Sequence, residues 1–347
     1  MSTTTRRLDG LDAARGLAVV SMLVAHLSPV GGVLNVTEYL TAPLFAVVIG
    51  LSMGVQLTER RPPAGQFVLD NVQRGLVLVV LGVLLQSIYA QIVVVVPYLG
   101  VLVIVLAPVA LLLHRMPVLT LGVAGALAVV GPIGADRARE AYPQLVGSWP
   151  SWALDVLRWV ATGESYRLLS FLPMALGGLA LASVLRRVTQ PPEVYLVSGV
   201  LFGLSVAAYA LGRGTADGSA AYSGTTAEVV GATLLSAAAV LASFVLVAVL
   251  RRVGAGAVLE PLLATGRLAL TAYTLQVLFL ALVQVLIGPR RDDSWLILGA
   301  TTVVVVGGSW LLERLLGTGP LEWVVHRLRP RLPGRQDPAT TRGRHAG

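Results

Sequence analysis

The stretch LDGLDAARGLAVVSMLVAHL, residues 8–27, leads from a polar turn directly into an apolar helix. Arg15 and His26 stand eleven positions apart in it. At about 100° and 1.5 Å per residue, this spacing returns His26 to almost the same helix face, about 16 Å further along the axis. One face of the helix therefore directs a cation and an imidazole toward the same space.

The depth of these two side chains in a membrane makes them candidate functional residues. If Arg15 lies at the cytoplasmic edge, His26 lies past the middle of a hydrocarbon core about 30 Å thick. An ionisable side chain at that depth is costly unless it faces the protein interior or a wet cavity. Two simpler interpretations stay open: Arg15 as an anchor that snorkels to the headgroups, and His26 as a buried histidine bonded to a neighbouring helix.

The composition defines the class of protein. Of 347 residues, 55% are hydrophobic and 13% are charged, and the mean hydropathy is +0.78. Soluble domains carry about 25% charged residues, so this is a polytopic membrane protein. The chain has no cysteine, and all 26 basic residues are arginine, which excludes thiolate metal sites, cysteine nucleophiles, lysine Schiff bases and Walker-type phosphate loops. We expect no metal site. We also expect no nucleic-acid partner, because the net charge of +8 is spread over short loops and a tail.

Ten apolar segments predict an all-α bundle of about ten transmembrane helices in the plasma membrane. We expect a single domain over residues 1–330 and a disordered basic tail over 331–347, beside anionic lipid. The predicted spans lie near residues 14–31, 41–58, 73–91, 94–113, 117–134, 168–185, 193–212, 227–250, 264–288 and 295–315. With the N-terminus inside, 19 arginines fall in inside segments and seven in outside segments. The positive-inside rule then places both termini in the cytoplasm.

Three smaller patterns predict local structure. In PSWALDVLRWVATG, residues 150–163, tryptophans at helical spacing predict a helix in the outer interface, either as an aromatic anchor or as a lid. SGTT, residues 223–226, predicts a serine or threonine N-cap. Gly50, Ser52 and Gly54 are small residues of the kind that allow close helix packing.

Several motifs give the chain a family resemblance. Arginine, ten residues and then histidine at the start of the first helix resembles the signature of membrane acyltransferase-3 proteins. LDAARG, residues 11–16, resembles the opening shared by heparan-alpha-glucosaminide N-acetyltransferase-like proteins and YeiB-like bacterial membrane proteins. Further similar segments are TAPLFAVVIGLSMGVQ, TGESYR with Arg167 in place of a proline, SGTT, GRLALTAY and GPLEW.

The resemblance implies a transmembrane acyltransferase of the bacterial cell envelope. Acyl-CoA, with acetyl-CoA first among the candidates, would be a cytoplasmic co-substrate rather than a bound cofactor. The acceptor would be an extracytoplasmic glycan or glycolipid. His26 would be the catalytic residue, as a general base or a transient acyl carrier. Arg15 would orient the site or, with Arg267 and Thr271, hold CoA.

Four further residues are expected as accessory groups: Asp12, Glu38, Glu164 and Tyr273. Asp12 would cap the first helix or pair with Arg15. Glu38 is the acid nearest the position where relatives carry an aspartate, which leaves the carboxylate partner of the histidine open. Arg267 at a helix start suits phosphate, and snorkelling is the alternative. One helix turn separates Arg267 from Thr271, so a continuous helix would put both on one face.

Another class of function is compatible with the same residues. In a proton-coupled transporter or flippase of a lipid-linked or acidic metabolite, His26 would relay protons and the arginines would bind substrate. The sequence shows no convincing internal repeat, which argues against this alternative. A non-catalytic scaffold and a homodimer also stay open at this stage.

Overall fold

The computed structural model describes residues 3–29, 33–88, 92–187, 191–215, 218–288 and 294–328. The predicted tail at 331–347 lies outside these ranges. The described chain is built of helices: α1 Thr3–Leu27, η1 Val33–Tyr39, α2 Thr41–Val55, η2 Gln56–Arg60, α3 Ala64–Gln86, α4 Val96–Leu113, α5 Pro117–Leu145, α6 Ser151–Leu157, η3 Arg158–Thr162, α7 Leu168–Arg187, α8 Pro191–Arg213, α9 Thr226–Arg252, η4 Gly256–Leu259, α10 Glu260–Arg267, α11 Ala269–Ile287, α12 Trp295–Thr302, η5 Val303–Gly307, α13 Gly308–Leu316 and α14 Pro320–Arg327.

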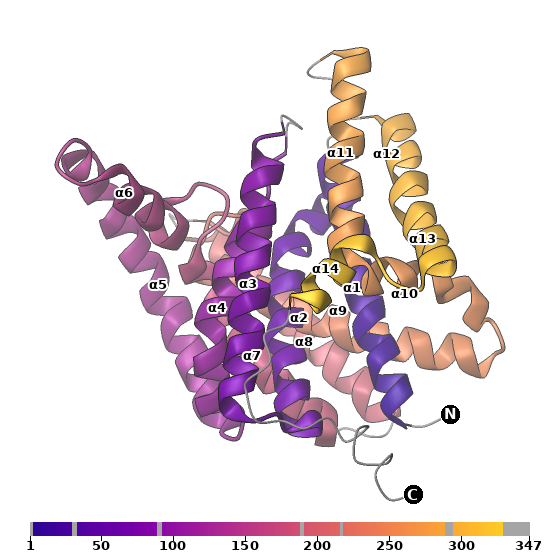
Figure 1. The fold of residues 1–347 in the computed structure, drawn as a ribbon. Coiled ribbons are helices and arrows are strands. Elements are labelled where there is room, and N and C mark those ends of the chain that lie inside the picture. The colour runs from indigo at the N-terminus through magenta and orange to yellow at the C-terminus, as the bar shows by residue number, and fades with distance from the viewer. Residues whose placement is uncertain are drawn as a thin grey trace, which may run out of the picture.

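Ten of the described helical segments are long and apolar enough to cross a membrane, as predicted. Each predicted span matches one of them, with shifted ends. In Figure 1, α1 begins at the lower edge of the bundle, and α5 leads upward to α6 near the upper edge. We call the side that holds Thr3 the N-terminal face, and the side that holds Leu27 and α6 the opposite face.

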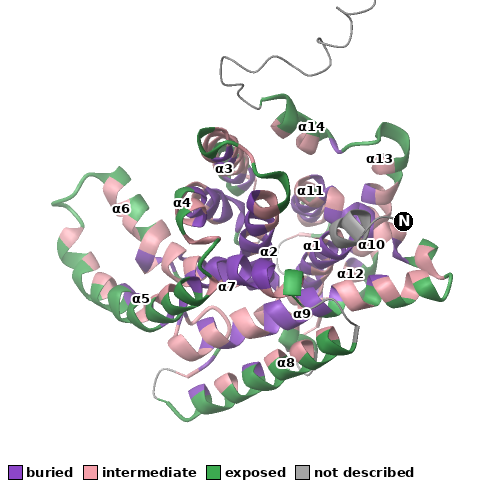
Figure 2. Cartoon of the chain, turned by 90° about the horizontal axis from the view of Figure 1, so that it is seen from below, coloured by how far each residue is buried: buried purple, intermediate pink, exposed green. Residues whose placement is uncertain are grey.

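The core of the bundle is built around α1, α2 and α7, which are the most buried helices in the view from below (Figure 2). Small residues bring α2 and α7 together. A Cβ atom on Gly50 would lie 1.7 Å from the Ala175 carbonyl oxygen, and one on Gly178 would lie 1.9 Å from the Val47 carbonyl oxygen. The predicted close packing at Gly50 and Gly54 is confirmed, because a Cβ atom on Gly54 would lie 2.6 Å from the Cβ atom of Ala182. Glycine is required here because the two backbones meet.

Two helix boundaries differ from the sequence prediction. The first helix starts at Thr3, so residues expected in a polar turn, Asp9 and Asp12 among them, lie inside α1. The fifth transmembrane helix continues eleven residues past the predicted end at 134. Residues 135–144 are too charged to extend the apolar segment, but they contain several good helix formers, so the helix continues through them. The helix predicted within residues 150–163 is confirmed as α6 with η3, and Trp152 on it is exposed. Its position in the membrane interface stays a prediction.

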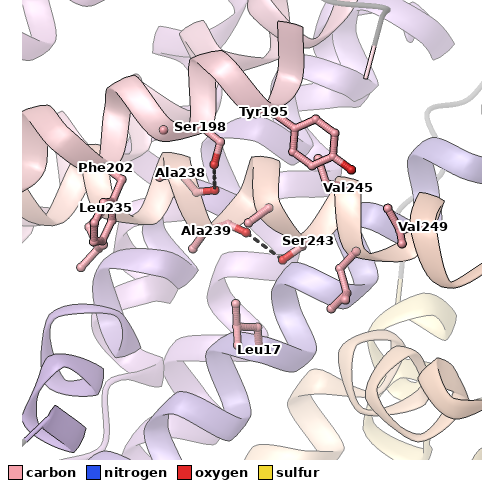
Figure 3. A pocket seen from close by; sticks show the side chains of 13 residues that line it. Leu17, Tyr195, Ser198, Phe202, Leu235, Ala238, Ala239, Ser243, Val245 and Val249 are labelled. Carbon is pink, nitrogen blue, oxygen red and sulfur yellow. Dashed lines mark hydrogen bonds between the residues drawn. The ribbon is translucent and has the colours of Figure 1, made fainter. Parts of the chain in front are cut away.

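A groove of about 810 Å³ opens on the side of the bundle between α8 and α9, with Leu17 of α1 lining its floor (Figure 3). Its walls come from apolar and small residues of the two helices. It is formed because Ser198, Gly199, Ala238, Ala239 and Ala242 leave space between the neighbouring backbones.

Candidate active site

Arg15 and His26 both lie on α1, which is an uninterrupted helix from Thr3 to Leu27. The predicted spacing therefore holds: the two residues share one helix face and are separated by about 16 Å along the axis. His26 is half-buried in the last turn of α1. Arg15 lies midway along α1, twelve residues from either end, and 25% of its side chain is exposed.

The guanidinium of Arg15 is held by two neighbours. Its Nη1 donates to Asp12 Oδ1 at 2.9 Å, one turn earlier on α1. Its Nη2 donates to Ser52 Oγ of α2, also at 2.9 Å, and Ser52 in turn donates to the Val48 carbonyl oxygen. Of the two roles expected for Asp12, pairing with Arg15 is confirmed and helix capping is wrong, because α1 begins nine residues earlier.

The short helix α10 packs directly on α1 beside this pair. A Cβ atom on Gly266 would lie 1.7 Å from the Asp12 carbonyl oxygen, and one on Gly16 would lie 2.3 Å from that of Leu262. Glycines on both helices therefore allow backbone contact. The contact brings Arg267 near enough to Asp12 for their charges to attract.

Arg267 is bound by carboxylates. Its Nε and Nη2 donate to the two carboxylate oxygens of Glu313 on α13, and Nη2 also lies 3.3 Å from Glu260 Oε2. The hydrogen bond and charge of Glu313 raise the pKa of the Arg267 guanidinium above its ordinary value. The Arg267 side chain is 31% exposed, so part of the group remains open to a ligand.

The helix between Arg267 and Thr271 is broken, against the sequence expectation. Leu268 has φ −104° and ψ 34° and separates α10 from α11. Arg267 and Thr271 therefore do not lie one turn apart on a continuous helix, and the prediction of a shared helix face is wrong. Thr271 instead binds a different acidic residue: its main-chain N–H and its hydroxyl both donate to Glu322 of α14.

Tyr273 is buried two residues further along α11. Its hydroxyl oxygen accepts a hydrogen bond from the main-chain N–H of Val95 at 3.1 Å. Val95 precedes the first turn of α4. Tyr273 therefore ties the beginning of α11 to the start of α4.

Glu38 lies at the opposite face, in η1. The segment is fixed to α1 by Ser21, whose hydroxyl donates to the Thr37 carbonyl oxygen at 3.1 Å. Next to Glu38, the hydroxyls of Thr41 and Tyr222 are hydrogen-bonded at 2.7 Å. Burial raises the pKa of Tyr222 to about 12, so this phenol stays neutral at physiological pH. Glu38 thus stands beside the last turns of α1, in the region where a partner for His26 was sought.

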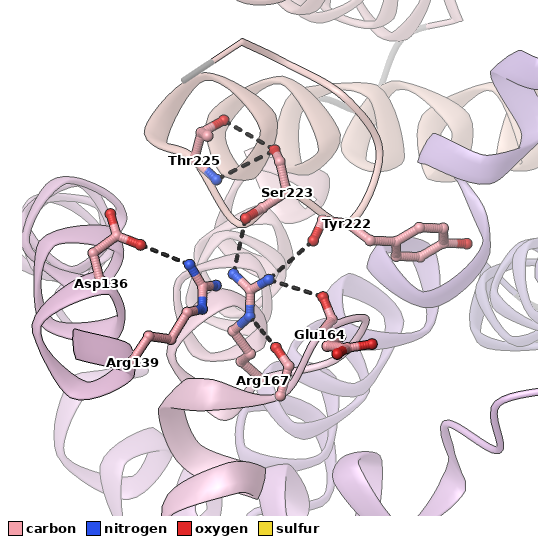
Figure 4. Close-up of polar contacts among 8 residues, drawn as sticks. Asp136, Arg139, Glu164, Arg167, Tyr222, Ser223 and Thr225 are labelled. Carbon is pink, nitrogen blue, oxygen red and sulfur yellow. Dashed lines mark hydrogen bonds and ion pairs between the residues drawn. The ribbon is translucent and has the colours of Figure 1, made fainter. Parts of the chain in front are cut away.

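The side chain of Glu164 is exposed at the same face, and its carbonyl oxygen belongs to the contacts of Arg167 (Figure 4). Arg167 donates to four carbonyl oxygens, those of Gly163, Glu164, Tyr222 and Ser223, at 2.6 to 3.2 Å. Burial lowers the pKa of Arg167 to about 10, which still leaves it protonated at neutral pH. The arginine that replaces the family proline thus joins the loop before α7 to the loop before α9.

The predicted N-cap lies in the second of these loops. Thr225 Oγ1 accepts from the main-chain N–H of Glu228 and caps α9, as expected. Ser223 is hydrogen-bonded to Thr225 and also supplies a carbonyl oxygen to Arg167. The motifs TGESYR and SGTT are therefore in contact.

The structure divides the expected site residues between the middle and the end of α1. Asp12 and Arg15 lie in the middle of the helix, with Arg267 beside Asp12, and Glu38 lies beside the end that carries His26. Sequence reasoning missed four residues that hold these groups: Ser52, Arg167, Glu313 and Glu322. Arg167 gave a signal as the departure from an expected proline, Glu322 lies in the GPLEW motif, and Ser52 was expected only as a packing residue. Glu313 gave no signal. Among the described residues, no group of three or more His, Asp or Glu side chains could hold a metal ion.

Comparison with known families agrees with the motifs. A family model described as "Acyltransferase domain" matches residues 8–314, which include all the site residues expected from the sequence and helices α2 to α12 in full, but not Glu322. A search of the curated proteins finds no match to this chain. The YeiB-like branch stays a prediction, because the family match does not reach that level. The chain belongs to the acyltransferase-3 family of membrane proteins.

Proposed function

We propose that the protein takes an acyl group, acetyl first among the candidates, from acyl-CoA at the N-terminal face. It passes the group to a hydroxyl or amine of a glycan or glycolipid at the opposite face. The observation that supports this is the placement of Arg15 and His26 on one face of an unbroken transmembrane helix in a chain of this family. By the arginine distribution, the N-terminal face is the cytoplasmic one.

In this proposal, Arg15 binds the anionic end of CoA and His26 acts at the thioester. Guanidinium forks match phosphate oxygens, and Asp12 and Ser52 hold the Arg15 fork in place. The long pantetheine arm between the phosphates and the thioester suits two groups that are about 16 Å apart. Arg267, which Glu313 fixes while it stays partly exposed, would be a second phosphate contact.

His26 has two chemically complete roles. As a general base, its imidazole removes the acceptor proton while the acceptor oxygen or nitrogen attacks the thioester carbonyl. The C–S bond then breaks, and the proton passes to the CoA thiolate. As a nucleophile, the imidazole forms an acyl-histidine and releases CoA, and the acceptor then takes the acyl group. Glu38, near the end of α1, would orient the imidazole or the acceptor.

The test is transfer of label from acyl-labelled acetyl-CoA in reconstituted vesicles. We expect wild type to label a glycan or the protein, and His26→Gln to abolish transfer while the melting temperature is retained. His114→Gln is the matched control, since His114 caps the end of α4 through main-chain carbonyl oxygens. Arg15→Gln should raise the KM for acetyl-CoA, whereas Arg115→Gln, an exposed arginine after α4, should not.

Two results would contradict the proposal. One is the absence of transfer from acetyl-CoA and from longer acyl-CoAs by folded wild-type protein in the presence of envelope glycans. The other is equal activity of His26→Gln and His114→Gln. Proton-coupled uptake would then be the activity to measure.

A further inference from the structure

The groove between α8 and α9 offers almost no polar contact. The hydroxyl of Ser198 donates to the Ala238 carbonyl oxygen, and that of Ser243 donates to the Ala239 carbonyl oxygen (Figure 3). The remaining walls are aliphatic or aromatic, apart from the hydroxyl of Tyr195 at one end. A volume of about 810 Å³ lies within the range of roughly 300–1,000 Å³ of ligand sites. The chemistry that fits such a groove is a hydrocarbon chain.

The groove ends at a positive charge. On α9 its wall runs through Leu235, Ala242 and Val249, which recur every seven residues and so share one face. Arg252 follows three residues after Val249, which places it about 60° around the helix at the edge of that face, and it is exposed in the last turn of α9. The neighbouring Arg251 is already paired with Asp9 of α1. Arg252 is therefore the cation placed to meet an anionic headgroup at the N-terminal face.

The groove is separate from the candidate active site. Leu17, which lines its floor, stands two residues after Arg15 and nine before His26. Those intervals correspond to rotations of about 200° and 180° around α1. The groove thus lies behind the helix face that carries Arg15 and His26, and a chain bound there does not reach that face.

We propose that this groove binds the acyl chains of an anionic phospholipid from the leaflet at the N-terminal face, with the headgroup phosphate at Arg252. The side chains of Phe202 and Leu246 are about half exposed on the rim, so a lipid can enter from the bilayer. Charge complementarity selects the headgroup, because arginine prefers phosphate and the cytoplasmic leaflet carries anionic lipid. The inference does not depend on the proposed acyl transfer.

The experiment measures the melting temperature of the full-length protein in neutral detergent with added lipid. Phosphatidylglycerol and phosphatidylcholine with identical chains are compared at equal mole fraction. A ligand that binds the folded state raises the melting temperature. We expect phosphatidylglycerol to give the larger rise, and glycerol phosphate without chains to give none.

Two glycines of α8 provide a matched pair of variants. A Cβ atom on either Gly199 or Gly203 would meet no atom within 4 Å, so a side chain fits at both positions without a clash. Gly199 lines the groove, whereas Gly203 is not among its lining residues. Gly199→Phe should therefore abolish the rise given by phosphatidylglycerol, and Gly203→Phe should keep it. Arg252→Gln should reduce the rise to that of phosphatidylcholine, whereas Arg187→Gln, at the end of α7, should not.

Three results would overturn the proposal. The first is an equal rise with both lipids in wild type, and the second is an equal loss in Gly199→Phe and Gly203→Phe. The third concerns a second copy of the chain as the occupant. The natural sequence has no cysteine, so Gly199→Cys carries a single thiol. Efficient disulfide dimerisation of Gly199→Cys in membranes, but not of Gly203→Cys, would show that a protein surface covers the groove.

Discussion

Glu322 of α14 is bound to Thr271 of α11 through three hydrogen bonds to the start of that helix. Its Oε1 accepts from the main-chain N–H groups of Leu270 and Thr271 at 2.9 and 3.0 Å, and its Oε2 accepts from the Thr271 hydroxyl. Two motifs more than fifty residues apart in the sequence, GRLALTAY and GPLEW, thus form one structural unit. The carboxylate satisfies helix N–H groups that have no partner within α11.

The first prediction concerns this cap. Glu322→Ala should lower the free energy of unfolding by about 1–2 kcal/mol, because two main-chain donors and one hydroxyl lose their acceptor. The measurement is chemical or thermal unfolding in detergent. Glu140→Ala, at an exposed position of α5, is the control and should change stability little. Equal stability of the two variants would show that the cap does not stabilise α11.

The second prediction separates the two roles of Arg267. In the proposed enzyme, Arg267→Gln should raise the KM for acyl-CoA about tenfold, the loss expected for one charge-assisted hydrogen bond of about 1.5 kcal/mol. Glu313→Gln keeps the Arg267 cation but weakens the hydrogen bonds that hold it. This variant should therefore lower the melting temperature and raise the KM for acyl-CoA less than Arg267→Gln does. Steady-state kinetics at matched folded amounts measure both values. A fall in melting temperature without any change in KM would assign Arg267 to structure alone.

The third prediction uses two glycines with left-handed backbones. Gly218 and Gly224 have φ of +68° and +72°, but only Gly224 lies against Arg167, whose Nη1 would be 1.8 Å from an added Cβ atom. Gly218→Ala should cost about 1–2 kcal/mol, the price of the left-handed conformation. Gly224→Ala should cost more, since it also displaces the guanidinium. Similar losses of unfolding free energy would mean that the arginine moves without cost.

The fourth prediction concerns Arg167 and alkaline pH. Burial holds its pKa near 10, below the ordinary 12.5, so between these values the unfolded chain binds more protons than the folded one. In that window, the contribution of Arg167 to stability rises with pH. Tyr222 acts in the opposite direction, because its pKa is raised from 10 to about 12 and the folded state there holds the additional proton.

Arg167→Met removes the first contribution and keeps the second. The free energy of unfolding should therefore fall more steeply between pH 10 and 12 in Arg167→Met than in wild type, and neither contribution should vary below about pH 9. At neutral pH the variant should be less stable by about 3 kcal/mol, since buried carbonyl oxygens lose a charged donor. Parallel pH profiles of the two proteins would contradict this account of Arg167.

The transmembrane helices and the pair of Asp12 and Arg15 on α1 could be predicted from the sequence. A bilayer requires about 20 apolar residues per helix, so hydropathy along the chain is enough to find the ten spans. The contact between Asp12 and Arg15 is also local, because three positions separate neighbours on one helix face. The shared face of Arg15 and His26 follows from the helix repeat alone, once α1 is continuous.

Only the tertiary structure decided what the other site residues bind. Arg267 pairs with Glu313, 46 positions away, and Thr271 with Glu322, 51 positions away, and no periodicity relates such distant positions. The break at Leu268, which separates these two pairs, depends on how α10 packs against α1 through Gly266. The sequence by itself determined which segments enter the membrane, because the hydrophobicity of a segment decides whether it is more stable in lipid or in water. The packing of helix on helix decided which charges meet, because it depends on the shape of the whole bundle.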